Sequence, residues 1–210
     1  MNKLIAAALA FCCAMAFAQT SSTASSPAPS TTPAPTQRLR GSVQSFDGKV
    51  LVMKERSGEV ITLALADNFA VTEVVPIEPS AIRSGSFVGV ASMPDADGRL
   101  RALEVLVFPE AARGSGEGHY GWDLQPGSMM TNATVAELAA APQGRNLTLR
   151  YKDGEKTVVV PDNVPVVTFK PGDKALLVPG AKVMVTAQLR DGKPTALRAL
   201  AGRDGFTPPM

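Results

Sequence analysis

Hydrophobic and polar residues alternate over short stretches of this chain, and turn-forming residues separate these stretches. Glu59–Leu65 carries apolar side chains at every second position from Ile61 onward, which predicts a half-buried strand. Asp47-Gly48 and Ser57-Gly58 border such stretches, and the glycine of each pair supplies the positive φ of a tight hairpin turn. Pattern and turns together predict an all-β fold.

The same alternation predicts twelve short strands in two groups of six. The first group is Ser42–Phe46, Lys49–Lys54, Glu59–Leu65, Ala70–Val75, Ser86–Met93 and Leu100–Phe108. The second group is Thr134–Leu138, Arg145–Tyr151, Lys156–Val160, Pro165–Phe169, Ala181–Leu189 and Thr195–Ala201. In Leu100–Phe108, alternation gives Leu103, Val105 and Val107 an inward face. Asp67-Asn68 is expected to be a turn, and Pro79–Arg83 a single helical turn.

The two groups repeat each other, with their turn residues in the same order. Asp97-Gly98 corresponds to Asp191-Gly192, 94 residues later, and Gly85 corresponds to Gly180, 95 residues later. Six short strands are too few for two well-covered sheets, whereas rolling one sheet into a barrel removes its edges. We therefore predict two tandem six-stranded antiparallel β-barrels of OB-like size, over residues 37–109 and 133–204.

The first residues of the chain have the pattern of an export signal. Lys3 is followed by an apolar run from Leu4 to Phe17, and Ala16-Phe17-Ala18 forms a small-x-small cleavage site. We expect a signal peptide over residues 1–18, cleavage between Ala18 and Gln19, and a periplasmic protein. A disordered linker rich in Ser, Thr, Pro and Ala is expected over residues 19–36.

Composition narrows the classes of function. Both cysteines, Cys12 and Cys13, lie in the signal, so no disulfide or thiolate metal site is expected after cleavage. Removal of Lys3 leaves 20 of the 21 basic residues against 19 acidic ones, with the two signs interspersed, which argues against a nucleic-acid partner. No second apolar run is long enough to span a membrane, so a membrane-spanning protein is not expected after cleavage.

The stretch between the two repeats, residues 110–132, has no counterpart elsewhere in the chain. It holds the only His, the only Trp and one of the two Tyr residues. Its candidate binding residues are Glu117, His119, Tyr120, Trp122 and Asp123. Three interpretations stay open, with packing between the barrels favoured over a ligand or partner site. The third is a metal site made of Glu117, His119 and Asp123 with the thioethers of Met129 and Met130.

Other motifs in the chain point to no chemistry. Gly116-x-Gly118-x-x-Gly121 matches the dinucleotide pattern by letter, but no helix is expected after it, so no cofactor is predicted. Ser115 does not lie in a nucleophile elbow. No catalytic residue is found, and the protein is predicted not to be an enzyme. Arg198 with Arg190, and Arg101 with Arg99, lie on outward strand faces, which suits solvent or, less often, an anionic ligand.

The recurring turns also resemble a known family. Gly85-Ser86-Phe87-Val88, Gly180-Ala181-Lys182-Val183 and the two Asp-Gly hairpins are similar to a domain of unknown function found in exported bacterial proteins as small β-barrels. The resemblance covers residues 39–210 and implies the fold, but no catalytic residues. Proteins of this kind are often labelled permeases of metal ABC transporters, and a permease needs several membrane-spanning helices that this sequence does not have.

These observations lead to two expected functions and leave a third hypothesis, an enzyme acting on a cell-wall or sugar substrate, which would need a deep cleft that holds carboxylates. The first is a non-enzymatic periplasmic protein whose barrels bind an envelope protein or another component of the cell envelope. The alternative is a periplasmic metal-binding or metal-handling accessory protein that uses the segment 110–132. A short tail, residues 205–210, is expected to fray unless it docks on the fold.

Overall fold

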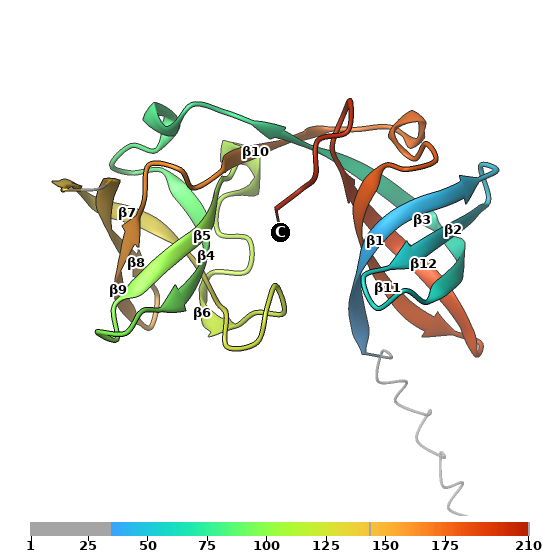
Figure 1. Cartoon of the computed structure of the whole chain (residues 1–210), viewed down its shortest axis with the longest axis horizontal. Helices are drawn as coiled ribbons and strands as arrows, with labels where there is room; N and C mark the ends of the chain where they lie inside the picture. The colour runs from blue at the N-terminus through green and yellow to red at the C-terminus, as the bar shows by residue number, and fades with distance from the viewer. Residues whose placement is uncertain (1–34, 143, 210) are drawn as a thin grey trace, which may run out of the picture. The chain divides into compact units, whose positions relative to one another are not determined.

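A computed structural model describes residues 35–142 and 144–209, and over these residues the chain is all-β (Figure 1). It contains strands and three short 3-10 turns: η1 (Pro79–Ala81), η2 (Glu110–Ala112) and η3 (Lys174–Leu176). The signal peptide and the linker before residue 35 lie outside the described residues. Within the described part of the chain, no helix has the length and hydropathy needed to cross a bilayer.

Five strands close into a barrel. They are β1 (Thr36–Phe46), β2 (Val50–Glu55), β3 (Val60–Pro76), β11 (Lys182–Arg190) and β12 (Lys193–Ala201). Antiparallel ladders join β3, β2, β1, β11 and β12 in that order, and a parallel ladder between β12 and β3 closes the ring. We call this the first barrel. Since every edge is paired, no strand edge of the ring is left open.

The other long strands form a second ring with the same order of pairing. They are β4 (Phe87–Pro94), β5 (Leu100–Val107), β7 (Met129–Ala141), β8 (Gly144–Tyr151) and β9 (Gly154–Val160). Two parallel residue pairs, Leu100 with Val158 and Arg101 with Val159, join β5 to β9 and complete this ring, which we call the second barrel. The short strand β6 (Gly118–Gly121) pairs with β7 outside the ring.

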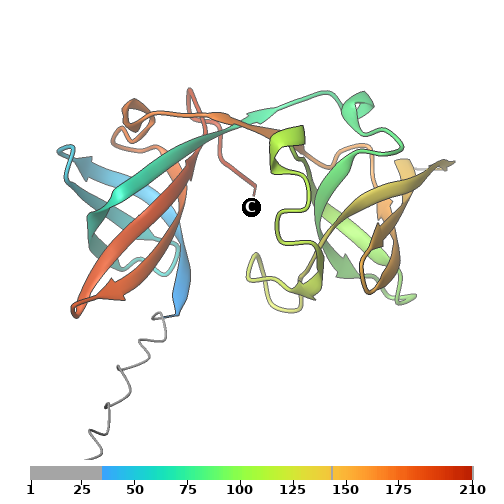
Figure 2. The same cartoon turned by 180° about the vertical axis from the view of Figure 1, so that it is seen from behind.

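Each ring takes strands from both halves of the sequence. Figure 2 shows blue N-terminal and orange-red C-terminal strands in one ring, and green, yellow and brown strands in the other. The expectation of two six-stranded barrels, each made from one repeat, is not confirmed. Instead, the rings have five strands each, and β4 and β5 pair with β7 to β9 while β11 and β12 pair with β1 to β3. Hairpin chemistry fixes local turns, but it leaves open which distant strand completes a ring.

The strand β10 (Val166–Pro171) connects the two rings. It pairs antiparallel with the end of β3, where Phe169 lies opposite Val74, and parallel with β5, where Val166 lies opposite Val105. In the first barrel, β12 pairs with β3 in the corresponding way, with Ala199 opposite Val71. We use these registers to name corresponding positions in the two barrels.

Each barrel has its own apolar interior. The first is filled by side chains such as Leu51, Met53 and Leu63, and the second by side chains such as Leu147, Leu149 and Val158, all fully buried. Two of the 3-10 turns contribute to these interiors. Ile82, which follows η1, packs in the second interior, and Leu176 of η3 packs in the first. A third cluster, which includes Val74, Leu106, Val167, Met184 and Leu200, lies outside both interiors.

Two local predictions were wrong. Asp67-Asn68 is not a turn, because β3 continues through it to Pro76, and the β12 ladder skips from Leu65 to Ala70. Leu103 does not face inward, because a bulge pairs Ala91 with Glu104 and Ser92 with Ala102, which leaves Leu103 between the paired residues. Ala102 faces the second interior in place of Leu103, while Val105 faces it as predicted. A bulge of this kind moves one residue out of the alternation on which the prediction depended.

The C-terminal segment docks on the fold. Arg203 forms a two-pronged ion pair with Glu73, at 2.8 and 2.9 Å, and Phe206 packs against the third cluster. A Cβ atom on Gly202 would lie 2.1 Å from the carbonyl oxygen of Phe206, so the chain can fold back only with glycine at this position. These contacts place the end of the described chain near β3 and β11.

A candidate ligand cavity

The outer faces of the two barrels carry side chains in matching rows. In the first barrel, Arg198, Thr186 and Arg38 lie side by side across β12, β11 and β1. In the second barrel, Glu104, Ala91 and Met130 lie side by side across β5, β4 and β7. Ala199 and Val105 occupy corresponding positions in the two barrels, and Arg198 and Glu104 are the residues directly before them. The two rows therefore occupy corresponding positions.

A second pair of rows lies next to the first. Leu200, Met184 and Arg40 are neighbours in the first barrel, and Leu106, Gly89 and Asn132 are neighbours in the second. Gly89 takes the place that corresponds to Met184. A Cβ atom on Gly89 would lie 2.6 Å from Oδ1 of Asn132 and 3.1 Å from the ring of Phe108, so glycine makes room for both side chains.

These rows contribute to the wall of a cavity of about 450 Å³. This volume falls in the range of pockets that hold small organic ligands. Much of the wall is apolar or aromatic, and its polar groups come from few positions. The lining residues are Arg38, Thr72, Glu104, Leu106, Phe108, Ala112, Ser115, Gly116, Tyr120, Trp122, Met130, Asn132, Phe169, Met184, Arg198 and Leu200.

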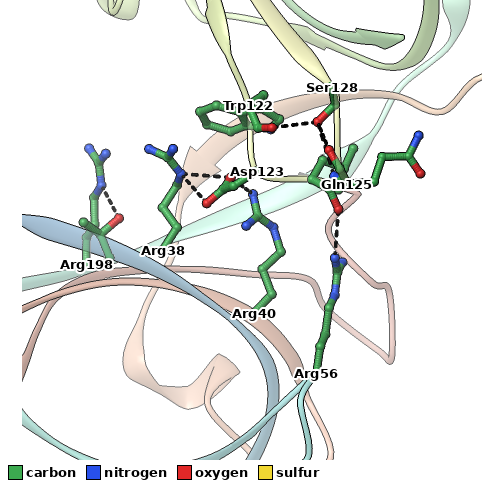
Figure 3. A network of polar contacts seen from close by, with 10 residues as sticks. Arg38, Arg40, Arg56, Trp122, Asp123, Gln125, Ser128 and Arg198 are labelled. Atoms are coloured by element: carbon green, nitrogen blue, oxygen red, sulfur yellow. Dashed lines mark hydrogen bonds and ion pairs between the residues drawn. The ribbon is translucent and has the colours of Figure 1, made fainter.

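One side of the cavity is held by a polar network around Asp123 (Figure 3). The carboxylate of Asp123 accepts hydrogen bonds from Nε of Arg38 at 3.0 and 3.1 Å and from Nη2 of Arg40 at 2.9 Å. Partial burial acts to raise the pKa of Asp123, but the hydrogen bonds and charges of Arg40 and Arg38 outweigh it and hold the pKa below its usual value. The network therefore ties the segment 110–132 to β1.

Trp122 lies against the same arginines. The guanidinium carbon of Arg38 is 4.2 Å from the centre of the indole ring, which is a cation–π contact. Ser128 fixes the backbone next to the ring, since its hydroxyl donates to the carbonyl oxygen of Trp122 at 2.8 Å and its carbonyl accepts from the Trp122 N–H at 2.7 Å. The tight turn from Gln125 to Ser128 thus presents Trp122 to the cavity.

Glu104 is the most unusual group on the wall. Its side chain is 1% exposed, and neither carboxyl oxygen has a hydrogen-bond partner among the described residues. Burial raises the pKa of Glu104 from 4.5 to about 8, and the positive charge of Arg40 limits that rise. The carboxyl group is therefore largely protonated at neutral pH and has a proton to donate.

Two further buried polar atoms on the wall are also without partners in the described chain. They are Nε1 of Trp122 and Oδ1 of Asn132. The amide nitrogen of Asn132 is satisfied, because it donates to the hydroxyl of Tyr120 at 3.0 Å and to the carbonyl oxygen of Gly116 at 3.1 Å. Buried polar groups are usually hydrogen-bonded, so three unpartnered groups around one cavity point to a molecule that partners them.

The five residues expected to form a binding site fall into two groups. Tyr120 and Trp122 line the cavity, and Asp123 anchors the arginines beside it. Glu117 and His119 have other partners. A carboxylate oxygen of Glu117 accepts from the backbone N–H of Lys152 at 3.0 Å, and Nδ1 of His119 lies 2.9 Å from the hydroxyl of Thr131. Burial, with a smaller effect of the Lys156 charge, lowers the pKa of His119.

The residues of the metal-binding alternative do not share one environment. His119 stacks on Tyr151, Asp123 is engaged by two arginines, and Met130 lines the cavity. Over residues 35–142 and 144–209, no three His, Cys, Asp or Glu side chains form a group that could hold a metal ion. This alternative stays a prediction to which the geometry adds no support.

Sequence reasoning missed most of the polar wall, namely Glu104, Arg38 and Asn132. Arg198 was placed on an outward face that suits solvent or an anionic ligand, and it lines the cavity. The signal that could have found the site is the repetition itself. Glu104 and Arg198 are 94 residues apart, the same separation as the two Asp-Gly hairpins, so an acid and a base occupy corresponding positions of the two repeats.

Comparisons with known proteins give no relative from which a function could be transferred. No family model, curated protein or solved structure matches the chain. The resemblance to exported small β-barrel domains therefore stays a prediction, and the cavity is the basis for a functional proposal.

Proposed function

We propose that this is a non-enzymatic binding protein of the periplasm that holds a small organic ligand in the cavity between the rows of Arg198 and Glu104. The observation that carries the proposal is Glu104, a carboxyl group with 1% exposure and no hydrogen-bond partner among the described residues, on the wall of a 450 Å³ cavity. Leaving such a group unpaired costs about 1–3 kcal/mol, and a ligand that pairs with it removes this cost.

The chemistry of the wall suits binding better than catalysis. Among its described lining residues, the ionisable groups are one carboxyl, two guanidinium groups and one phenol. Aromatic and thioether side chains supply an apolar surface, and the few polar groups would fix the orientation of a ligand. Export to the periplasm rests on the predicted signal peptide. A ligand carried to or from an envelope partner fits the same expectation.

Trp122 makes the proposal testable without a known ligand, because it is the only tryptophan and it lines the cavity. The purified protein is incubated with periplasmic extract and then examined by native mass spectrometry and by tryptophan emission. We expect a bound small molecule and a shift of the emission. Ala112→Leu, which adds volume to the cavity wall, is expected to lose both signals.

The matched control is Ala111→Leu, which adds the same volume at the neighbouring, exposed residue that does not line the cavity. It is expected to bind like the wild type. Equal binding by both variants would place the ligand elsewhere and reject the cavity, and so would a wild-type protein that takes up no molecule from the extract.

A further inference from the structure

The charges around the cavity narrow the class of ligand, and this inference rests on the proposed binding function. Arg38, Arg40 and Arg198 come from the first barrel, while Asp123 is the carboxylate that pairs with two of them. With Glu104 protonated, the guanidinium groups of Arg38 and Arg198 on the wall and the Arg40–Asp123 pair beside it leave a positive net charge. The cavity is therefore electropositive although the chain as a whole is nearly neutral.

Arg198 is the cation most open to a ligand. Its Nε donates to the hydroxyl of Thr186 at 3.2 Å, and among the described residues it forms no ion pair. Figure 3 shows the side chains of Arg38 and Arg198 extending in the same direction from their strands. Two guanidinium groups in one row offer the planar, charge-assisted hydrogen bonds that carboxylates accept.

We propose that the ligand is a small organic carboxylate with an apolar body, bound with its anionic group at Arg38 and Arg198. The apolar body lies against Met184 of the first barrel, Met130 of the second and Phe169 of the connecting strand β10, which line the same cavity. Glu104, as a neutral acid, donates a hydrogen bond to an oxygen of the ligand. The indole N–H of Trp122 is a second donor that is free to do the same.

The acid on the wall makes binding depend on pH in a defined direction. Burial raises the pKa of Glu104 to about 8, so above this pH the group is an anion. An anionic Glu104 no longer donates and repels a carboxylate ligand, so affinity falls as the pH rises through 8. Burial raises the pKa of the Tyr120 hydroxyl, so Tyr120 stays neutral over this range and does not add to the trend. A cationic ligand would show the opposite trend.

Three probes of the same shape test the charge of the ligand: phenylbutyrate, its neutral amide phenylbutanamide, and the cation phenylbutylamine. Each is titrated into the wild-type protein while the emission of Trp122 is followed. We expect phenylbutyrate to bind at least about tenfold more tightly than the other two at neutral pH. Its dissociation constant is expected to rise by about five- to tenfold between about pH 7 and pH 9.

Single substitutions separate the contributions of individual wall residues to phenylbutyrate affinity. Arg198→Gln is expected to weaken phenylbutyrate binding about tenfold and to leave the amide unchanged. Arg101→Gln, on the exposed part of β5 and away from the cavity, serves as the matched control and is expected to bind like the wild type. Glu104→Gln is expected to remove the pH dependence between about pH 7 and pH 9.

The outcomes distinguish this inference from the proposed function. Tighter binding of the amine, or equal binding of all three probes, would overturn the carboxylate and still support a ligand cavity. The same conclusion would follow if the wild type takes up a ligand from the extract that the Ala112→Leu variant does not bind, while phenylbutyrate does not change the emission of Trp122. Unchanged phenylbutyrate binding in Arg198→Gln would overturn the assignment of the anionic group to Arg198.

Discussion

The outer faces of the two barrels have the same ladder positions but different chemistry. The row of Arg198, Thr186 and Arg38 in the first barrel corresponds to the row of Glu104, Ala91 and Met130 in the second. Inside the barrels, by contrast, corresponding positions hold similar aliphatic side chains, such as Ala199 and Val105. The chain thus keeps its interiors alike and varies the faces that line the cavity.

This difference shows where selectivity can arise in a fold built from two similar rings. Side chains in the interiors have to fill a small ring, so corresponding positions tolerate little change. The outer faces carry no such requirement. Arginine in one row and a buried acid in the other give the cavity two chemically distinct sides, which a pair of identical faces would not provide.

The largest change in the free energy of unfolding is expected at a position where the two rings differ by a single methyl group. Gly41 in β1 corresponds to Ala133 in β7, since each pairs with a valine of the next strand, Val183 and Val88. A Cβ atom on Gly41 would lie 2.0 Å from the backbone oxygen of Lys54, whereas Ala133 is fully buried without such a clash. Gly41→Ala is expected to lower the free energy of unfolding by about 3 kcal/mol or more, measured by urea denaturation.

The reverse change, Ala133→Gly, is the control for that comparison. It removes a buried methyl group and adds backbone freedom, so a loss of about 1 kcal/mol is expected. Similar losses for the two variants would contradict the view that β1 and β2 approach more closely than β7 and β8.

The second prediction concerns the acid that corresponds to Arg198. The pKa of Glu104 is raised from 4.5 to about 8 in the fold, so the folded state holds this proton more tightly than the unfolded chain does. Its contribution to stability is present below pH 4.5 and is lost as the pH rises to 8. Glu104→Gln, which keeps the shape without the charge, is expected to be more stable than the wild type by a few kcal/mol at about pH 9 and similar to it at about pH 5.

Urea denaturation of both proteins at the two pH values measures this difference. Glu137→Gln, at an exposed carboxylate on β7, is the matched control and is expected to change stability little at either pH. A wild type that is as stable at high pH as Glu104→Gln would show that the carboxylate finds a partner when it ionises.

The third prediction tests how the segment 110–132 is held against Arg38 and Arg40 of β1. Asp123→Asn removes the carboxylate that Arg38 and Arg40 share, and a loss of about 1–2 kcal/mol is expected, with a shift of the Trp122 emission. Because the pKa of Asp123 is lowered in the fold, its contribution is present above its ordinary pKa and fades as the pH falls through the folded value. The wild type and the variant should therefore converge in acid.

Asp97→Asn provides the comparison for Asp123. Asp97 pairs with Arg99 on the surface, where the two side chains are 73% and 66% exposed, and such pairs contribute little. We expect a change below about 0.5 kcal/mol and no change in the emission of Trp122. An equal effect of the two substitutions would argue that the Asp123 network does not hold the cavity wall.

The sequence predicted the all-β class and most of the strands because turns and alternation are local properties. The hairpin turns at Gly48 and Gly98 have the positive φ that their Asp-Gly pairs predict. The exchange of strands between the two halves was not predictable in this way. Either half could pair its strands with itself or with the other half, and both choices satisfy the same turns and the same alternation.

The candidate site was predicted in part for a similar reason. Trp122 and Tyr120 were predicted as binding residues because they are rare residue types in a unique segment, and both line the cavity. Glu104 was not predicted, since an acid on the outward face of a strand ordinarily meets solvent, and only its correspondence to Arg198 in the repeat sets it apart. Its burial depends on the arrangement of two rings, which no local pattern encodes.

The smallest change in the free energy of unfolding is expected at a position where one ring has a continuous strand and the corresponding segment of the other is interrupted by a turn. β3 runs unbroken through Asp67-Asn68, whereas the corresponding Asp162-Asn163 forms a turn between β9 and β10. Two prolines, Pro161 and Pro165, flank that turn and cannot donate to a ladder. The same sequence pair therefore takes two conformations because its neighbours differ.

Pro165→Ala tests this explanation, since Pro165 is exposed and corresponds to Ala70 in β3. Its carbonyl oxygen accepts from the N–H of Val105 at 3.0 Å, and alanine keeps that bond. The main change is a more flexible unfolded chain, so a loss of about 0.4–1 kcal/mol is expected in urea denaturation. A loss above about 2 kcal/mol would instead mean that the ring of Pro165 holds β10 in place, and a gain would mean that β9 and β10 join into one strand like β3.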